Sequence, residues 1–241
     1  MKVIPLRAEH IHDVAVLHIQ GISSGFISSL GINFVTALYE AIAQNRESFG
    51  FAAEDKYGRV LGFVTLATNL DKLYKSLIAK KGWRFALLLA GRMFSFKCLR
   101  KILETLFYSR RINQICETDL PAAELLLIVV DPVKYHTGLA TQLLQTSMEH
   151  CRKVGLDEIK VLVASDNIPA NKFYLKCGFR FVGQVNNHNN VVSNVYEADV
   201  DEALREIECK KELSNNCFAS SGPNKEKLSY RRAEGPLACV A

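Results

Sequence analysis

Apolar residues recur along the chain with two periods, and these periods predict an alternation of strands and helices. Short apolar runs bounded by turn residues predict strands, and longer segments with apolar residues three or four positions apart predict amphipathic helices. In chain order the pattern predicts a strand at 3–6, helices at 9–19 and 34–43, a hairpin of strands at 49–53 and 60–66, a strand at 123–130, a helix at 137–154, a strand at 159–164, a helix at 167–176 and a hairpin of strands at 179–185 and 191–198.

The run from 123 to 130 is apolar at nearly every position and is closed by Asp131-Pro132. A strand that is apolar on both faces is typically buried between two layers, so this run is predicted to be a central strand. Helices alternate with strands on both sides of it in the sequence. The pattern therefore predicts an α/β fold with a mixed sheet flanked by helices.

Residues 70–112 form a basic segment inserted before the central strand. This segment contains eleven Lys and Arg residues and two acidic residues, so its charge is +9, whereas the whole chain has a net charge of +5. Apolar residues recur at helical spacing with a break at Gly82, which predicts a basic helical hairpin. Three uses remain open: a solvated hairpin packed on the core, a lid that attracts an acidic ligand, or an apolar face resting on an anionic membrane.

The composition fits one large domain. The chain has 241 residues, 49% apolar and 23% charged, and can bury a sizeable core. No apolar run approaches the roughly 20 residues that a membrane-spanning helix needs, and no signal peptide is recognisable at the start, so we expect a cytoplasmic protein. We expect one domain over 1–200, with the basic segment within it, and a disordered tail over 213–241, where Ser, Asn, Gly, Pro and isolated charges predominate.

The cysteines and histidines indicate neither a disulfide framework nor a metal site. Seven cysteines occur without a Cys-x-x-Cys pair, and we expect reduced thiols. The six histidines lack the spacing of zinc ligands, so no metal is predicted. Nucleic acid is not expected as a partner, because the basic segment carries no nucleic-acid-binding motif and the remainder of the chain is acidic.

The junction after the central strand has the pattern of an anion site. The strand ends at Val130, a short loop follows, and a helix begins at Gly138-Leu139-Ala140. Free backbone amides at a helix start, with the helix dipole behind them, bind anions well. The loop has neither of the two common nucleotide-binding glycine patterns. Taken alone, the small residues could equally serve helix packing.

A second motif follows about thirty residues later, and the two together resemble the GCN5-related N-acetyltransferase (GNAT) family. The second motif is Asn167, Ala170, Phe173-Tyr174 and Gly178-Phe179. The resemblance is close from 123 to 181 and implies a GNAT-like twisted mixed sheet with helices on both faces. It departs from the family at Tyr135, where Arg or Gln is usual, and at His136, where a small residue often stands.

The resemblance implies that acetyl-CoA is the bound anion, with its pyrophosphate at the loop and its pantetheine arm along the central strand. The expected cofactor-binding residues are Ile128, Val129, Val130, Lys134, His136, Thr137, Gly138, Leu139, Ala140, Thr141, Asn167 and Phe173.

Two side chains are the candidate catalytic residues. Tyr174 fits the acid that protonates the departing thiolate, with aromatic packing as its alternative role. Glu124 is the best candidate base, since strand alternation places it on the face of Leu126 and Ile128. An exposed strand-end carboxylate is the equally supported alternative for Glu124, and loss of the proton to water is adequate for some amines.

The predicted function is acetyl transfer to an amine of a small molecule, such as an acidic amino-sugar derivative, by direct attack in a ternary complex. A hydroxyl acceptor, a non-catalytic acyl-CoA-binding module and a protein N-acetyltransferase are the alternatives. Fold resemblance does not fix the acceptor, and the sequence leaves the oligomeric state open.

Overall fold

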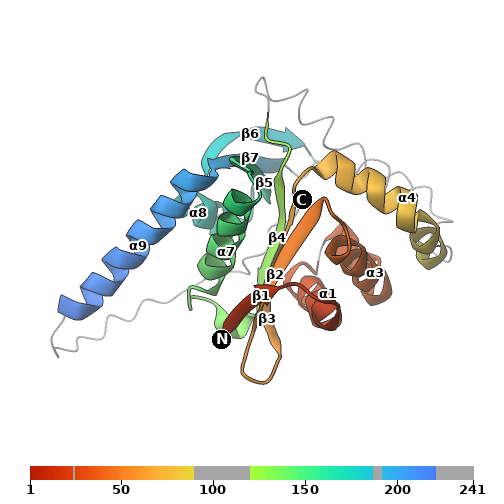
Figure 1. Ribbon diagram of the computed structural model, residues 1–241, viewed down its shortest axis with the longest axis horizontal. Coiled ribbons are helices and arrows are strands. Elements are labelled where there is room, and N and C mark those ends of the chain that lie inside the picture. Colours follow the sequence, from red (N-terminus) through yellow and green to blue (C-terminus); the bar gives the residue numbers. More distant parts are fainter. Residues whose placement is uncertain (24, 90–119, 187–191, 221–241) are drawn as a thin grey trace.

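The computed structural model describes residues 1–23, 25–89, 120–186 and 192–220 (Figure 1). The described strands form one sheet in the order β1-β2-β3-β4-β5-β7-β6. Neighbouring strands are antiparallel except β4 and β5, which are parallel, so the sheet is mixed as predicted. The strands are β1 Lys2–Pro5, β2 Ser48–Glu54, β3 Val60–Ala67, β4 Glu124–Val130, β5 Glu158–Ala164, β6 Arg180–Asn186 and β7 Val192–Asp199.

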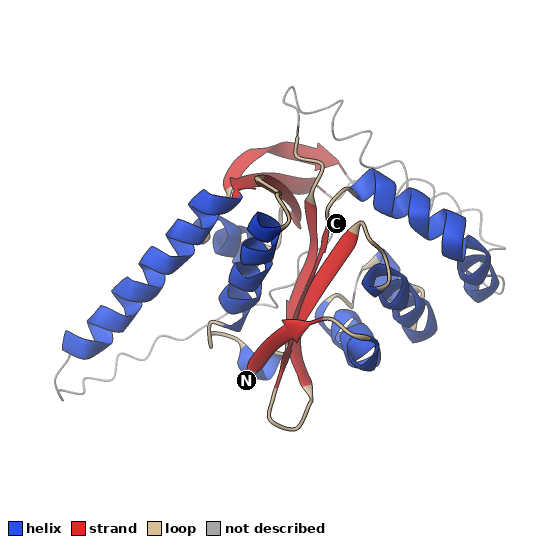
Figure 2. Cartoon of the chain, viewed as in Figure 1, coloured by secondary structure: helices blue, strands red, loops and turns tan. Residues whose placement is uncertain are grey.

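Helices cover both faces of this sheet (Figure 2). Helices α1, α3 and α4 lie on one side of the molecule, and α7, α8 and α9 lie on the other. The α-helices are α1 Ile11–Gly21, α2 Phe26–Ser29, α3 Ile32–Ala43, α4 Leu70–Leu89, α7 Leu139–Lys153, α8 Ile168–Lys176 and α9 Val200–Ser220, with short 3-10 helices η1 Ala8–His10 and η2 Pro132–Lys134. Every element predicted outside the insertion is present, with ends within about two residues.

Strand β4 is central and buried on both faces, which confirms the interpretation of its continuous apolar run. Ile128 and Val130 belong to the core that the sheet forms with α7 and α8. Leu127 and Val129 belong to the core that it forms with α1 and α3. The two helical layers therefore meet through this strand, and its C-terminal end is held rigidly from both sides.

Helix α4 is the described part of the predicted basic hairpin, and it corrects one detail. The helix passes through Gly82 without the predicted break. A glycine inside a helix costs about 1 kcal/mol relative to alanine, and tertiary packing on both sides offsets this cost. Leu77 is buried before Gly82, and Phe85 after it contacts Phe34 of α3 with ring centroids 5.3 Å apart. The second half of the predicted hairpin, 90–112, lies outside the described residues.

Helix α9 was not among the predicted elements. It begins where β7 ends, and the Asp199 side chain accepts a hydrogen bond from the Glu202 amide at 2.8 Å as its cap. Ala203, Leu204 and Ile207 are buried on the core, which explains why the helix forms. It extends to Ser220 and so includes the first residues of the segment for which a tail was predicted; 221–241 lie outside the described residues.

Three expectations from composition can be compared with the described part of the chain. Cys151, Cys177 and Cys209 are free thiols, and burial raises the pKa of the first two to about 12. Among the described residues, no three His, Cys, Asp or Glu side chains are grouped to hold a metal ion. Within the same residues, no helix is both long and apolar enough to cross a membrane.

Candidate active site

Strands β4 and β5 pair only at their beginnings, and the opening between them is the central feature of the candidate site. Glu124 pairs with Lys160 and Leu125 with Val161, and the ladder ends there although both strands continue. The unpaired part of β4 continues to Val130, next to the loop that follows the strand. An extended ligand can lie in such an opening and take the place of a missing strand neighbour.

The backbone on the open side of β4 is available for hydrogen bonding. On its other side the strand remains paired with β3 as far as Val130, and the Asp131 amide donates to the Leu61 carbonyl at 2.8 Å. Because backbone groups in an antiparallel ladder alternate in direction, Val130 and Ile128 turn their N–H and C=O groups toward β5. These are two of the three β4 residues predicted to hold the pantetheine arm.

A bulge in β4 corrects the predicted placement of Glu124. The register with β3 shifts next to Leu125, so Leu126 is an extra residue without a partner. The extra residue reverses the alternation, and Ile128 therefore packs toward α7 and α8, whereas Leu126 packs toward α1 and α3. Glu124 shares a face with Leu126, as predicted, but the prediction that Ile128 lies on this face is wrong.

The loop after β4 is shaped by local caps and two left-handed residues. The Asp131 side chain accepts a hydrogen bond from the Val133 amide at 2.9 Å, which starts η2. His136 has φ 63° and Gly138 has φ 78°, so the chain reverses sharply before α7. A Cβ added at Gly138 would meet nothing within 4 Å, which means that this side of the loop faces open space. A ligand can therefore approach the backbone closely there.

The first turn of α7 has the free backbone amides on which the predicted anion site depends. The amides of Leu139, Ala140 and Thr141 lie in the first helical turn and have no carbonyl partner within the helix. The helix dipole adds positive potential at the same point. Next to it, the Thr137 hydroxyl donates to the Lys134 carbonyl at 2.7 Å and closes the loop. The predicted loop residues are thus brought together around one helix start.

Tyr135 occupies the position where the resemblance leads one to expect Arg or Gln, and the structure gives it a packing role. Its side chain is half-buried and packs against the core shared with α7. Burial, together with the charge of Asp131, raises the pKa of its phenol. Tyr135 therefore adds no positive charge, so the prediction of an anion site at this loop rests on the backbone amides, with Lys134 as the neighbouring cation.

The second motif lies in α8. Asn167 caps this helix, since its side-chain oxygen accepts a hydrogen bond from the Ala170 amide at 3.2 Å. Tyr174 is fully buried, and its ring meets Phe173 and Phe179 edge to face at 5.1 and 5.0 Å. The described contacts are thus a helix cap and an aromatic cluster. The parts assigned to Asn167, Phe173 and Tyr174 in acetyl transfer stay predictions.

Glu124 is completely buried at the point where β4 and β5 separate. Neither carboxyl oxygen has a hydrogen-bond partner within the described part of the chain. Burial raises the pKa of Glu124 to about 7, and the Lys160 ammonium, 3.9 Å away, acts in the opposite direction. A carboxyl with a pKa in this range can accept a proton near neutral pH.

Two residues around Glu124 were missed in the sequence. Lys160 is buried, and its ammonium also donates a hydrogen bond to the Pro121 carbonyl. The available signal was a charged residue within an otherwise apolar strand. Tyr74 comes from α4, and its pKa is raised by burial and then by the charges of Glu124 and Asp71. Helix α4 thus contributes a phenol to the surroundings of the carboxyl.

A family model described as "Acetyltransferase (GNAT) family" matches residues 23–179. The chain belongs to the GNAT acetyltransferase family. The match includes the opening between β4 and β5, the loop predicted to bind an anion and α8, so the family's shared region coincides with the candidate site. Members of this GNAT family use acetyl-CoA, which the opening and the helix start fit.

Solved GNAT structures share the fold at low sequence identity. One is a single-site mutant of the spermidine N-acetyltransferase SpeG from Vibrio cholerae, with a TM-score of 0.52 and 16% identity over 85% of this chain and 98% of that one. Another is a GCN5-related N-acetyltransferase from Kribbella flavida, with a TM-score of 0.54 and 15% identity over 82% and 96%. At these sequence identities, the similarity to the solved structures shows the fold alone.

A curated relative is the uncharacterized protein YxbD of Bacillus subtilis (strain 168). It is 39% identical over 54 residues, which are 22% of this chain. The matched part spans 34% of the relative's length. Together the comparisons confirm the predicted family and α/β fold, and they leave the acceptor undetermined.

Proposed function

We propose that this GNAT chain transfers the acetyl group of acetyl-CoA to an amine of a small molecule within one ternary complex. The observation that carries the proposal is the buried Glu124 carboxyl, without a hydrogen-bond partner among the described residues, at the apex of the opening between β4 and β5. Burying a carboxyl without hydrogen bonds is costly. A ligand amine reaching the apex would supply the missing donor.

The predicted cofactor residues have complementary tasks in this proposal. The backbone groups of Ile128 and Val130 hold the extended pantetheine arm, with Val129 fixing the strand from its other face. The α7 amides bind the pyrophosphate, and the loop side chains of Lys134, His136 and Thr137 surround it. Asn167 and Phe173 border the arm from α8.

The chemistry requires loss of a proton from the amine and gain of a proton by the leaving thiolate. The neutral acceptor nitrogen forms a bond to the carbonyl carbon as the carbon–sulfur bond breaks, and Glu124 takes the proton that the nitrogen loses once this bond has formed. Tyr174 gives its phenolic proton to the CoA sulfur. General acid and base catalysis of this kind contributes about 10²- to 10⁴-fold in rate.

The distance between Glu124 and the thioester determines how the proton of the amine reaches the carboxyl. Ile128 lies four positions after Glu124 along β4, roughly 13 Å at the rise of a strand. The proton of an amine that attacks a thioester beside Ile128 therefore reaches the carboxyl through a chain of bridging waters. A thioester that lies deeper in the opening, toward the bulge at Leu126, allows direct contact.

Release of CoA in the presence of acceptors tests the proposal. The wild-type protein is incubated with acetyl-CoA and a panel of amines, and free thiol is measured with a chromogenic disulfide. Acceptor-dependent release by the wild type that is greatly reduced in Glu124→Gln supports the proposal. Tight acetyl-CoA binding without release for any acceptor supports the non-catalytic acyl-CoA-binding alternative.

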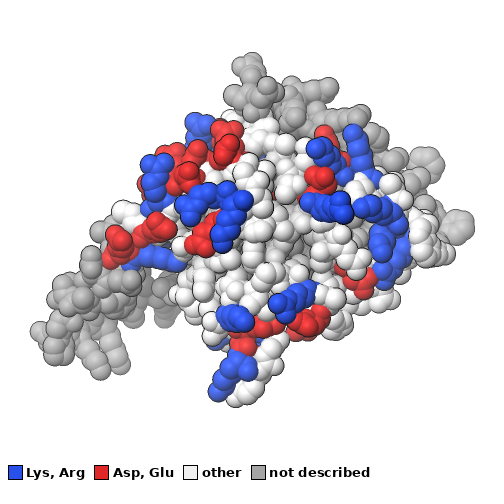
Figure 3. All heavy atoms as spheres, viewed as in Figure 1, with Lys and Arg blue, Asp and Glu red and all other residues white. Residues whose placement is uncertain are grey.

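The acceptor panel follows from the charge around α4. Lys72, Lys75 and Lys80 are exposed on this helix, and Figure 3 shows Lys and Arg gathered over it. Such a surface favours an acidic acceptor, for example an amino sugar linked to a nucleotide. Spermidine belongs in the panel because structural neighbours act on it. Peptides and hydroxyl acceptors test the remaining alternatives.

A peripheral contact with an anionic membrane is a second proposal for α4. Trp83 and Leu87 lie one turn apart, and 69% and 65% of their surfaces are exposed. Lys80 precedes them on the same side of the helix. Aromatic and aliphatic residues with adjacent lysines fit the boundary of an anionic bilayer. Such a contact would bring the site to a lipid-linked acceptor.

A further inference from the structure

Charged side chains form a row across four adjacent strands on the face that carries Glu124. Glu124 on β4 is in register with Lys160 on β5, Lys160 with Glu197 on β7, and Glu197 with Arg180 on β6. Register partners project from the same face of a sheet. The charges along the row alternate in sign, from the edge of the sheet to its centre.

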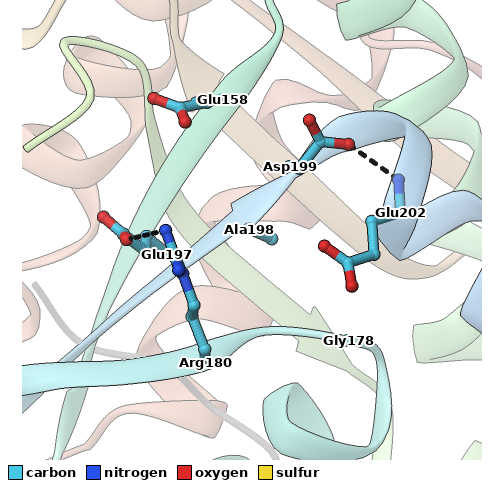
Figure 4. Close-up of a pocket in the computed structure, with 7 residues that line it drawn as sticks. All are labelled: Glu158, Gly178, Arg180, Glu197, Ala198, Asp199 and Glu202. Carbon is cyan, nitrogen blue, oxygen red and sulfur yellow. Dashed lines mark hydrogen bonds and ion pairs between the residues drawn. The ribbon is translucent and has the colours of Figure 1, made fainter.

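Burial increases along this row. At the edge, Arg180 is 75% exposed and its guanidinium lies 2.6 Å from the Glu197 carboxylate. Figure 4 shows this pair at the rim of a pocket that is also lined by acidic side chains, among them Glu158. At the centre, the side chains of Lys160 and Glu124 are 5% and 0% exposed. Only the inner pair is sheltered from water.

The inner pair interacts through charge without a hydrogen bond. The Lys160 ammonium lies 3.9 Å from the nearer Glu124 oxygen, beyond hydrogen-bond distance, and is held by the Pro121 carbonyl. Both carboxyl oxygens therefore keep their lone pairs for another donor. A buried pair of this kind adds little net stability compared with apolar residues. We therefore consider what Lys160 does to the ionisation of the Glu124 carboxyl.

We propose, resting on the proposed function, that Lys160 is a positioning residue for proton removal. Its ammonium, fixed by the Pro121 carbonyl, stabilises the ionised carboxylate of Glu124, the form that accepts the proton of the acceptor amine. Lys160 acts through Glu124 and itself touches neither substrate.

Among the charged groups around Glu124, Lys160 is the cation that acts on the pKa of its carboxyl. Burial raises the pKa of Glu124 to about 7, and Lys160 is the charge that lowers it. On α4, Tyr74 is a neutral phenol, because burial and then the charges of Glu124 and Asp71 raise its pKa. Arg180 and Glu197 lie further along the row and largely neutralise each other.

Titration of the Glu124 carboxyl by NMR, on protein labelled with ¹³C at glutamate side chains, tests the proposal without any acceptor. The signal is assigned by its loss in Glu124→Gln. In Lys160→Met the pKa of Glu124 is expected to rise by about one unit or more, since removal of an opposite charge within 4–6 Å has an effect of this size. The matched control, Arg180→Gln, removes a cation of the same row and is expected to leave the titration unchanged.

Kinetics supply the second readout once an acceptor is known. In Lys160→Met the acidic limb of the kcat/KM profile is expected to move to higher pH by the same amount. At pH values above this limb, kcat/KM should approach the wild-type value. In Lys160→Arg the limb should return to its wild-type position. If Lys160→Met does not fold, Lys160→Gln replaces it, because the amide can still donate toward Pro121. An unchanged pKa of Glu124 overturns the proposal. A protein that titrates as expected but transfers no acetyl group contradicts the proposed function instead.

Discussion

At the scale of single residues, the environment of Glu124 matters most for the proposed chemistry. Its pKa is raised because burial disfavours the charged carboxylate more strongly than Lys160 favours it. The carboxyl is therefore half-ionised near neutral pH, where a base can both accept and release a proton.

Acetyl transfer is expected to fall as the pH drops below about 7, because protonated Glu124 cannot act as a base. In Glu124→Gln, kcat/KM is expected to fall by roughly 10²-fold or more at pH 8 and to lose this acidic limb. The measurement is kcat/KM from pH 5.5 to 9 for both proteins. Acetyl-CoA affinity, measured by calorimetry, should be the same in both. A limb that persists in Glu124→Gln would mean that another group titrates.

Tyr174→Phe distinguishes the two roles considered for Tyr174, the acid that protonates the thiolate and an aromatic packing residue. The ring contacts with Phe173 and Phe179 are retained by phenylalanine, so the free energy of unfolding is expected to change by less than about 1 kcal/mol. The rate of acetyl transfer is expected to fall by roughly 10²-fold, because the thiolate leaves without a proton donor. Urea denaturation and steady-state kinetics give the two values. A full rate in the variant would assign Tyr174 to packing alone.

At the scale of elements, the start of α7 and the opening between β4 and β5 together form the proposed cofactor site. The helix start supplies amides and a dipole, and the open side of β4 supplies an unpaired strand edge. Each is weak alone as an indication of function. Their adjacency follows from the loop that joins β4 to α7.

Gly138→Asp and Gly138→Asn form a matched pair for the anion site. Both residues tolerate left-handed backbone angles better than other side chains, and a Cβ at this position meets nothing within 4 Å, so similar folding is expected. Asp adds a negative charge where the pyrophosphate should bind. Calorimetry is expected to show micromolar acetyl-CoA binding by the wild type, weaker binding by the Asn variant and none by the Asp variant. Equal affinity of the Asp and Asn variants would place the phosphates elsewhere.

Helix α4 is expected to bind anionic but not neutral vesicles at low salt. Exchanging Lys72, Lys75 and Lys80 for Glu should abolish co-sedimentation, because the electrostatic attraction reverses. Trp83→Ser with Leu87→Ser should weaken it, because both side chains are exposed on the helix. Lys210→Glu, on α9, is the control that changes charge elsewhere. If the wild-type protein does not co-sediment with anionic vesicles, the membrane proposal is wrong, and α4 is then a surface for acidic acceptors.

At the scale of the whole molecule, the buried carboxyl links stability to pH. Between pH 4.5, the ordinary pKa of a glutamate, and about 7, native Glu124 binds a proton that the unfolded chain has lost. The free energy of unfolding therefore falls as the pH rises through this window. Relative to Glu124→Gln, the wild type should lose on the order of 3 kcal/mol between pH 4 and 8. Urea denaturation at several pH values measures this difference, and parallel curves would contradict it.

Much of the fold and part of the site could be predicted because they depend on local sequence. The continuous apolar run of β4, the left-handed Gly138 and the periodicity of α7 each express a preference within a few residues. The motif around Asn167 and Tyr174 identified the family for the same reason. The missed elements, α2 and α9, are short or strongly polar on their exposed side, and the break predicted at Gly82 was outweighed by packing against α3.

The sequence by itself determined the family, the order of the strands and helices along the chain, and the residue types at the cofactor loop. Only the tertiary structure decided which side chains surround Glu124. The bulge at Leu126 turns Ile128 to the other face, and the parallel register of β4 with β5 brings Lys160 beside the carboxyl. The physical reason is that strand pairing joins segments more than thirty residues apart through backbone groups that every residue shares. Side-chain periodicity records which face is buried, and it carries no information about the partner across the sheet.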